Sequence, residues 1–260
     1  MTRFALKLEY DGTHFVGWQR QANGPSIQQC LEQAAAPLNN QTEPPIAAAG
    51  RTDAGVHATG QVALLTLPDA APSRFTARTI RDALNYHLQP HPIVVLEAAL
   101  ITDPDWHPRF SAIARHYRYI ILNRPARPAL EATRVWHVKT PLDATLMHQA
   151  AQSLLGKHDF TSFRATACQA NSPLRTLDRF TITREDNHII ATISARSFLH
   201  HQVRNMIGTL KLIGDHSLSA DSLPKILAQK SRAVAGPTAP PTGLFLSAID
   251  FRADPFADMK

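Results

Sequence analysis

The chain has few of the residues that build disulfide-linked, metal-binding or membrane-spanning proteins. Its 260 residues include only two cysteines, Cys30 and Cys168, which form neither a disulfide framework nor a metal-ligand spacing. No run of about 18 apolar residues is present for a membrane span, and the segment from Met1 to Lys7 lacks the apolar core of a secretory signal. These absences predict a cytoplasmic protein without a membrane segment.

Motifs for nucleotide cofactors are missing as well. Gly50-Arg51-Thr52 has no glycine-rich cradle before it and no lysine, and G-x-G-x-x-G does not occur. The 13 histidines raise the question of a metal site, but His200 and His201 are adjacent, and His57 has no cysteine or carboxylate at a recognised ligand spacing. The sequence therefore disfavours a nucleotide-cofactor enzyme and a metal site.

Acidic residues are absent from one basic segment. The whole chain carries 27 Lys and Arg against 21 Asp and Glu, a net charge of +6. The segment from Trp106 to Pro128 holds five arginines and no Asp or Glu, and its aromatic residues include Tyr117 and Tyr119. Basic groups bind phosphates and aromatic faces stack on unpaired bases, which favours contact with nucleic acid. A solvated basic strand with its aromatic residues in the core is the alternative.

One carboxylate stands alone in its part of the chain. Asp53 is the only acid between Ala47 and Pro68, and it lies in a loop, residues 50–61, that also contains three glycines. Glycine lets a ligand approach the backbone closely, and a carboxylate can act as nucleophile or general acid or base. Arg204, near the start of an expected helix, is a distant candidate partner that would favour the charged form. A catalytic loop and a glycine-rich connection with solvated charges both fit this pattern.

Apolar periodicity predicts alternating strands and helices. The expected strands cover 3–10, 46–49, 61–67, 93–96, 115–122, 177–184, 188–195 and 244–250. The expected helices begin after Ser26, cover 76–88, begin after Asp143 with Gly156 as the stop, cover 201–213, and begin near Ser222. We predict an α+β protein of two similar halves, residues 1–104 with Asp53 and residues 105–260, whose mixed or antiparallel sheets are covered by helices. We expect the active-site cleft between the halves.

Seven short motifs occur in order over nearly the whole chain. They are E-Y-D-G at 9–12 with G-W-Q-R-Q at 17–21, A-G-R-T-D-A-G-V-H at 49–57, F-S-A at 110–112, R-H-Y-R-Y at 115–119, D-F-T-S-F at 159–163, H-H-Q-V-R-N at 200–205 and G-L-F-L at 243–246. Together they resemble the tRNA pseudouridine synthase A family. The resemblance implies an isomerase that converts uridine to pseudouridine in the anticodon stem-loop, at tRNA positions 38 to 40. It also implies a homodimer in which one tRNA contacts both subunits, and neither a metal nor an organic cofactor.

The resemblance also implies roles for individual residues. Asp53 matches the essential aspartate that initiates cleavage of the C–N glycosidic bond, by attack on C1′, by attack on C6 or by proton abstraction. Arg204 matches the arginine that pairs with this carboxylate, and Tyr117 matches the residue that packs against the target uracil. Arg51 matches the arginine that holds the flipped-out nucleotide or fills its place. The remaining expected RNA contacts are Arg115, Arg118, Gln19 and His201.

Two other functions fit parts of the sequence. A non-catalytic tRNA-binding or RNA-folding protein would use the basic segment, although it would gain nothing from Asp53, because a carboxylate repels phosphate. An aspartate-based nucleoside hydrolase would use the same carboxylate and release free uracil. The products formed from RNA distinguish the three functions.

Overall fold

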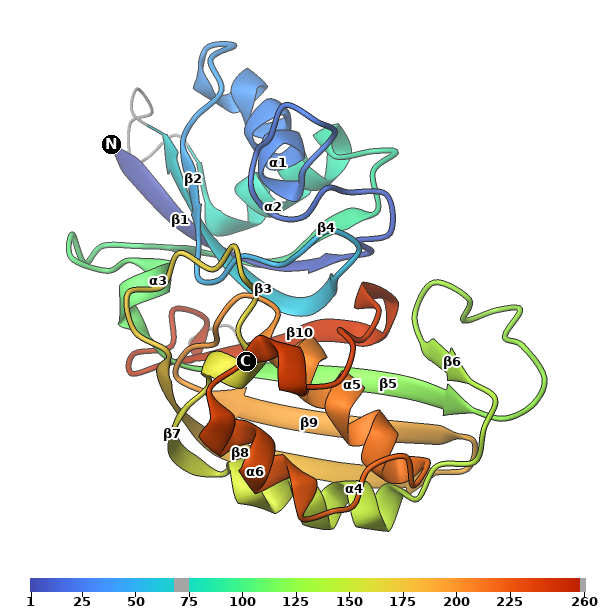
Figure 1. Ribbon diagram of the computed structural model, residues 1–260. Coiled ribbons are helices and arrows are strands. Elements are labelled where there is room, and N and C mark those ends of the chain that lie inside the picture. Colours follow the sequence, from blue (N-terminus) through green and yellow to red (C-terminus); the bar gives the residue numbers. More distant parts are fainter. Residues whose placement is uncertain (68–74, 258–260) are drawn as a thin grey trace. The chain divides into compact units, whose positions relative to one another are not determined.

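The computed structural model describes residues 1–67 and 75–257 and divides the chain into two compact units (Figure 1). The first unit contains Met1–Ile113 and Leu246–Lys260, and the second contains Ala114–Phe245. The second unit is therefore inserted between two pieces of the first. The division into an N-terminal domain, residues 1–104, and a C-terminal domain, residues 105–260, stays a prediction.

The first unit is a sheet with two helices packed on it. Its strands follow the order β4 (Ile93–Leu100), β1 (Thr2–Tyr10), β3 (His57–Leu67) and β10 (Leu244–Phe251), and β2 (Ile46–Ala48) pairs with β3. Strand β1 runs antiparallel to both β3 and β4. Helices α1 (Ile27–Ala35) and α2 (Ala77–His87) lie on one face (Figure 1), and a short helix, α3 (Pro108–Ser111), follows β4. The side chain of Asn85 on α2 bonds both backbone groups of Val95 on β4, at 2.9 and 2.8 Å.

The second unit repeats this arrangement with other elements. Its sheet has the order β5 (Ala112–Asn123), β9 (His188–Ala195), β8 (Leu174–Glu185) and β7 (Gly156–Asp159), and these neighbours pair antiparallel. Strand β6 (Trp136–Val138) pairs parallel with β5. Helices α4 (Ala144–Ala151), α5 (Gln202–Gly214) and α6 (Ser222–Gln229) cover one face (Figure 1). The predicted α+β fold with mixed pairing and covering helices is confirmed.

Local sequence signals account for several helix starts and ends. The hydroxyl of Ser26 accepts a bond from the backbone N–H of Gln29 at 3.2 Å, and Asp143 accepts one from Leu146 at 2.8 Å, so both predicted N-caps are confirmed. Helix α1 ends before Pro37 and continues as the 3-10 turn Ala36–Asn39, because proline cannot extend an α-helix. The other 3-10 turns are Gln152–Leu154, Thr161–Phe163, Arg232–Val234 and Pro241–Gly243.

The structure corrects some of the expected boundaries. Gly156 does not stop a helix: α4 ends at Ala151, and Gly156 opens strand β7 with a φ of +89°. Strand β3 begins at His57 rather than at residue 61, and β4 extends to Leu100 rather than ending at 96. In β3 the added residue Ala58 pairs with Tyr10 of β1, and in β4 the added residues 97–100 all pair with β1. These are long-range contacts that periodicity does not report. No helix in the described part of the chain combines the length and apolar character that crossing a bilayer requires.

Candidate active site

The loop that carries Asp53 connects β2 to β3 in the first unit, and hydrogen bonds to the residue before Asp53 hold it in place. Arg51 is exposed, Asp53 is half-buried, and Thr52 between them is buried. The hydroxyl groups of Tyr10 and Thr52 are hydrogen-bonded at 2.8 Å, and the backbone N–H of Trp18 donates to the Thr52 carbonyl at 3.0 Å. These bonds hold the residue before Asp53, so they orient the backbone that presents its carboxylate.

Two glycines let neighbouring backbone lie directly against this loop. A Cβ on Gly12 would stand 2.0 Å from the carbonyl oxygen of Val56, and a Cβ on Gly17 would stand 2.7 Å from that of Thr52. Gly17 also has a φ of +109°, a conformation that other residues rarely adopt. The motifs at 9–12 and 17–21 therefore support the loop through close backbone contact. Gln19, in the middle of the second of these motifs, is exposed.

Two buried side chains close the base of the loop. The Nδ1 of His57 accepts a hydrogen bond from the backbone N–H of Gly12 at 3.0 Å, and the His57 side chain is almost fully buried. At the other end of the loop, Gln61 donates from Nε2 to the Gly50 carbonyl at 2.7 Å. Gln61 thus joins the start of the loop to β3, and His57 joins its end to the turn after β1. Sequence reasoning missed the role of Gln61, although a glutamine in an otherwise apolar strand is a signal for it.

Replacing Tyr10 with phenylalanine is expected to destabilise the protein by about 1–2 kcal/mol at pH 7, because the buried Thr52 hydroxyl loses its partner. Burial raises the pKa of Tyr10 from 10.0 to about 12, partly opposed by hydrogen bonds from Thr52 and Gln61. A raised pKa stabilises the folded state below pH 10, and this contribution of roughly 3 kcal/mol is lost as the pH rises toward 12. Urea unfolding of both proteins at several pH values is the measurement. The stability difference should fall between pH 10 and 12 and change sign near pH 12, because the phenylalanine variant has no group to titrate there, and a constant difference would contradict the assignment.

In the second unit, strand β5 presents the predicted residues on both of its faces. Arg115 is buried and donates from Nη1 to the carbonyl of Arg196 at 2.7 Å. Tyr117 is half-buried and meets the ring of Phe198 edge-on, with ring centres 5.1 Å apart. Arg118 alternates to the opposite face, where its guanidinium lies 5.5 Å from the ring centre of Phe245. Residues 196–198, after β9, therefore support Arg115 and Tyr117 together.

Helix α5 begins directly after the adjacent residues His200 and His201 and carries Arg204 in its first turn. His201 precedes the helix with a φ of +60°, and its ring centre lies 4.0 Å from that of His200. Arg204 is half-buried; its Nε donates to the Ala239 carbonyl at 2.8 Å, and its own carbonyl accepts from the Ala239 N–H at 3.1 Å. Burial raises the pKa of the neighbouring Tyr119 above its ordinary range, although the charge of Arg204 opposes the shift. Arg204 is thus anchored to the segment before β10.

Asn205 connects three segments of the second unit and was not predicted as a site residue. Its side chain is fully buried and donates from Nδ2 to the Phe163 carbonyl at 2.8 Å. Its Oδ1 accepts from the Thr238 hydroxyl at 2.7 Å and from Arg232 at 3.2 Å. The D-F-T-S-F and H-H-Q-V-R-N motifs are therefore joined by one amide. The position of Asn205 at the end of H-H-Q-V-R-N was the signal from which its role could have been predicted.

The predicted residues divide between the two units. Asp53, Arg51 and Gln19 belong to the first, and Tyr117, Arg115, Arg118, His201 and Arg204 belong to the second. The pairing of Asp53 with Arg204 stays a prediction. Within either unit by itself, the described residues gather no three histidine, cysteine, aspartate or glutamate side chains close enough to hold one metal ion.

Comparison with known proteins identifies the same family that the seven motifs resemble. A family model described as tRNA pseudouridine synthase matches residues 7–111 and 150–252. The chain is 59% identical to tRNA pseudouridine synthase A of Acidiphilium cryptum over 98% of its own length and 99% of that protein. It is 55% identical to the enzyme of that name from Gluconobacter oxydans, over 98% and 92% of the two chains, and 53% identical to that of Rhodospirillum centenum, over 95% and 98%. Because the match covers most of both units, the chain belongs to the tRNA pseudouridine synthase family.

Proposed function

We propose that this isomerase converts uridine to pseudouridine in the anticodon stem-loop of tRNA, at positions 38 to 40, with Asp53 as the catalytic carboxylate. The observation that carries this proposal is the set of contacts that hold the Asp53 loop in place. Thr52 is hydrogen-bonded on both its side chain and its carbonyl, and glycines at 12 and 17 bring two backbone segments into contact with the loop. A carboxylate presented so rigidly suits a reaction that needs one acid in a defined place.

The reaction makes demands that the predicted residues meet. The base must leave C1′, turn while it is retained, and rejoin through C5, so the site has to enclose the base and exclude water. Flipping the nucleotide out of the stem costs a few kcal/mol, which stacking and phosphate contacts offset. Tyr117 supplies the aromatic face, and its edge contact with Phe198 holds the ring in place. Arg204 keeps Asp53 ionised, and Arg51 holds the flipped nucleotide or fills the space it leaves.

The RNA contacts and the assembly complete the proposal. Arg115, Arg118, Gln19 and His201 contact the RNA outside the reacting base. Two copies of the chain form a homodimer in which one tRNA contacts both, and the enzyme works in the cytoplasm without a metal or organic cofactor. Asp53 begins the reaction at C1′ or C6, or by abstracting a proton, and the three routes use the same residues.

The proposal is tested by the product formed from a defined RNA. Purified protein is incubated with an unmodified anticodon stem-loop transcript, and the RNA is mapped for pseudouridine while the solution is analysed for free uracil. We expect pseudouridine at positions 38 to 40 and no uracil. Free uracil would indicate a nucleoside hydrolase, and tight binding without either product would indicate a binding protein. Mapping tRNA from cells with and without the protein identifies the natural targets.

A further inference from the structure

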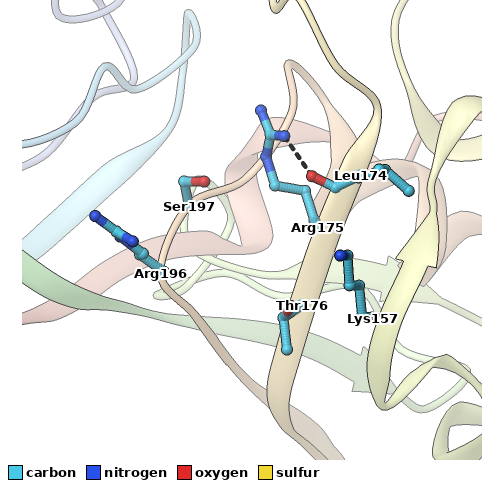
Figure 2. Close-up of a pocket in the computed structure, with 6 residues that line it drawn as sticks. All are labelled: Lys157, Leu174, Arg175, Thr176, Arg196 and Ser197. Atoms are coloured by element: carbon cyan, nitrogen blue, oxygen red, sulfur yellow. Dashed lines mark hydrogen bonds between the residues drawn. The ribbon is translucent and has the colours of Figure 1, made fainter.

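A basic pocket lies at one end of the second unit's sheet, and its lining contains none of the residues predicted for the active site (Figure 2). It has a volume of about 180 Å³. Its lining residues come from β7, from the start of β8 and from the segment after β9: Lys157, Leu174, Arg175, Thr176, Arg196 and Ser197. Because β8 pairs with both β7 and β9, the three segments meet although they are distant in the sequence.

The pocket lining carries three positive charges and no carboxylate. The side chains of Lys157 and Arg196 are exposed and make no hydrogen bond or ion pair within the described residues. Arg175 lies between them (Figure 2) and donates from Nη1 to the carbonyls of Ser172 and Leu174 at 3.0 and 2.6 Å. Its Nε is buried without a partner among the described residues. Burial, together with the nearby Arg164, lowers the pKa of Arg175. An anion in the pocket would offset the repulsion among these positive charges and would accept a hydrogen bond from the unpaired Nε–H of Arg175.

The neighbouring residues indicate which anion. The carbonyl of Arg196 holds Arg115, and Phe198, one residue beyond the pocket, packs on Tyr117. The pocket therefore adjoins the segment that supports the proposed uracil-stacking residue. Its lining has hydroxyl groups on Thr176 and Ser197 but no aromatic ring on which a free nucleotide's base would stack. Guanidinium, ammonium and hydroxyl donors around a small space suit the two free oxygens of a phosphodiester.

We propose that this pocket binds one phosphate of the RNA backbone next to the modified uridine, through Lys157, Arg175 and Arg196. The inference rests on the proposed function, because it requires tRNA as the substrate. A phosphate contact carries no sequence information but sets the register of the strand. The pocket thus positions the RNA chain so that the correct nucleotide reaches Tyr117.

The test uses the full-length double variant Lys157→Gln/Arg196→Gln. Neither side chain has a structural partner among the described residues, and the bond to Arg115 uses the Arg196 backbone, so the variant should fold, as thermal unfolding will verify. The matched control is Arg78→Gln/Lys225→Gln, which removes two exposed cations that already pair with Asp82 and Asp221. Affinity for the anticodon stem-loop is measured over a range of salt concentrations, and KM and kcat are measured for pseudouridine formation.

For the pocket variant we expect about tenfold weaker binding at low salt and a corresponding rise in KM. The slope of log affinity against log salt should become shallower by about 0.7–0.9, the value for one lost phosphate contact. The control should retain the affinity and slope of the unaltered protein. Equal slopes and affinities for the two double variants would overturn the inference while leaving pseudouridine formation intact. If the unaltered protein binds RNA but forms no pseudouridine, the proposed function fails, and the slopes still decide the pocket. Inorganic phosphate that occupies the pocket without weakening RNA binding would also overturn it.

Discussion

Replacing Asp53 with asparagine is expected to lower the rate of pseudouridine formation by at least about 10³-fold, because the amide is neither a nucleophile nor a base. The substitution keeps the size and shape of the side chain, and the support of the loop by Tyr10, Trp18 and Gln61 does not involve the carboxylate. RNA affinity should therefore stay within about threefold, since phosphate contacts dominate binding. Single-turnover conversion of the stem-loop and a separate binding titration measure the two effects.

The matched control is Asp105→Asn, which makes the same change at an exposed carboxylate of the first unit. It should retain full activity. A wild-type rate for Asp53→Asn would remove Asp53 from the mechanism. Weaker RNA binding with an unchanged single-turnover rate would give Asp53 a structural role instead. Equal rescue of growth by the unaltered protein and by Asp53→Asn, in cells that lack the protein, would favour the binding-protein function.

Replacing Gly208 with alanine is expected to lower Tm by about 5 °C or more and to lower activity with it. Gly208 lies in α5, and a Cβ there would stand 1.7 Å from the Pro237 carbonyl oxygen. Helix propensity alone favours alanine by about 1 kcal/mol, but a collision with backbone in a packed interior costs about 2–3 kcal/mol or more. The segment that must move contains Ala239, which bonds both the side chain and the backbone of Arg204. Displacement there disturbs the proposed partner of Asp53.

The control for this change is Gly50→Ala. Apart from Gly50 and its two chain neighbours, no heavy atom of the described residues lies within 4 Å of the Cβ that alanine would add, so Tm should change by less than about 1 °C. Thermal unfolding of the two variants side by side separates the collision from the general effect of replacing glycine. An unchanged Tm for Gly208→Ala would show that the segment at 236–239 moves freely, and the anchoring of Arg204 would have to be abandoned.

Much of the fold follows from local patterns in the sequence. Alternating apolar residues mark β1, and Phe4, Leu6, Leu8 and Tyr10 are buried as that pattern predicts. Ser26 and Asp143 cap helices because their oxygens reach N–H groups three residues ahead, a contact that needs no tertiary partner. Patterns that depend only on residues a few positions apart can therefore be read from a single sequence.

Boundaries that depend on distant pairing were not predictable in this way. Gly156 has the residue type of a helix stop, but its neighbours pair with β8 and make it the start of β7. The last strand returns to the first unit, where a Cβ on Gly60 would stand 2.4 Å from the carbonyl of Ser247. Such close contact between residues far apart in the chain leaves no local periodicity.

The sequence by itself determined the family, the α+β class and the isolated carboxylate at Asp53, because motifs and alternation are written in adjacent residues. Only the tertiary structure decided how the Asp53 loop is held, since Tyr10, Gly12 and Gly17 reach it from another strand and its following turn. The basic pocket likewise depends on folding, because Lys157, Arg175 and Arg196 come from three separate segments. Their charges meet through strand pairing, and strand pairing is set by the packing of the whole unit.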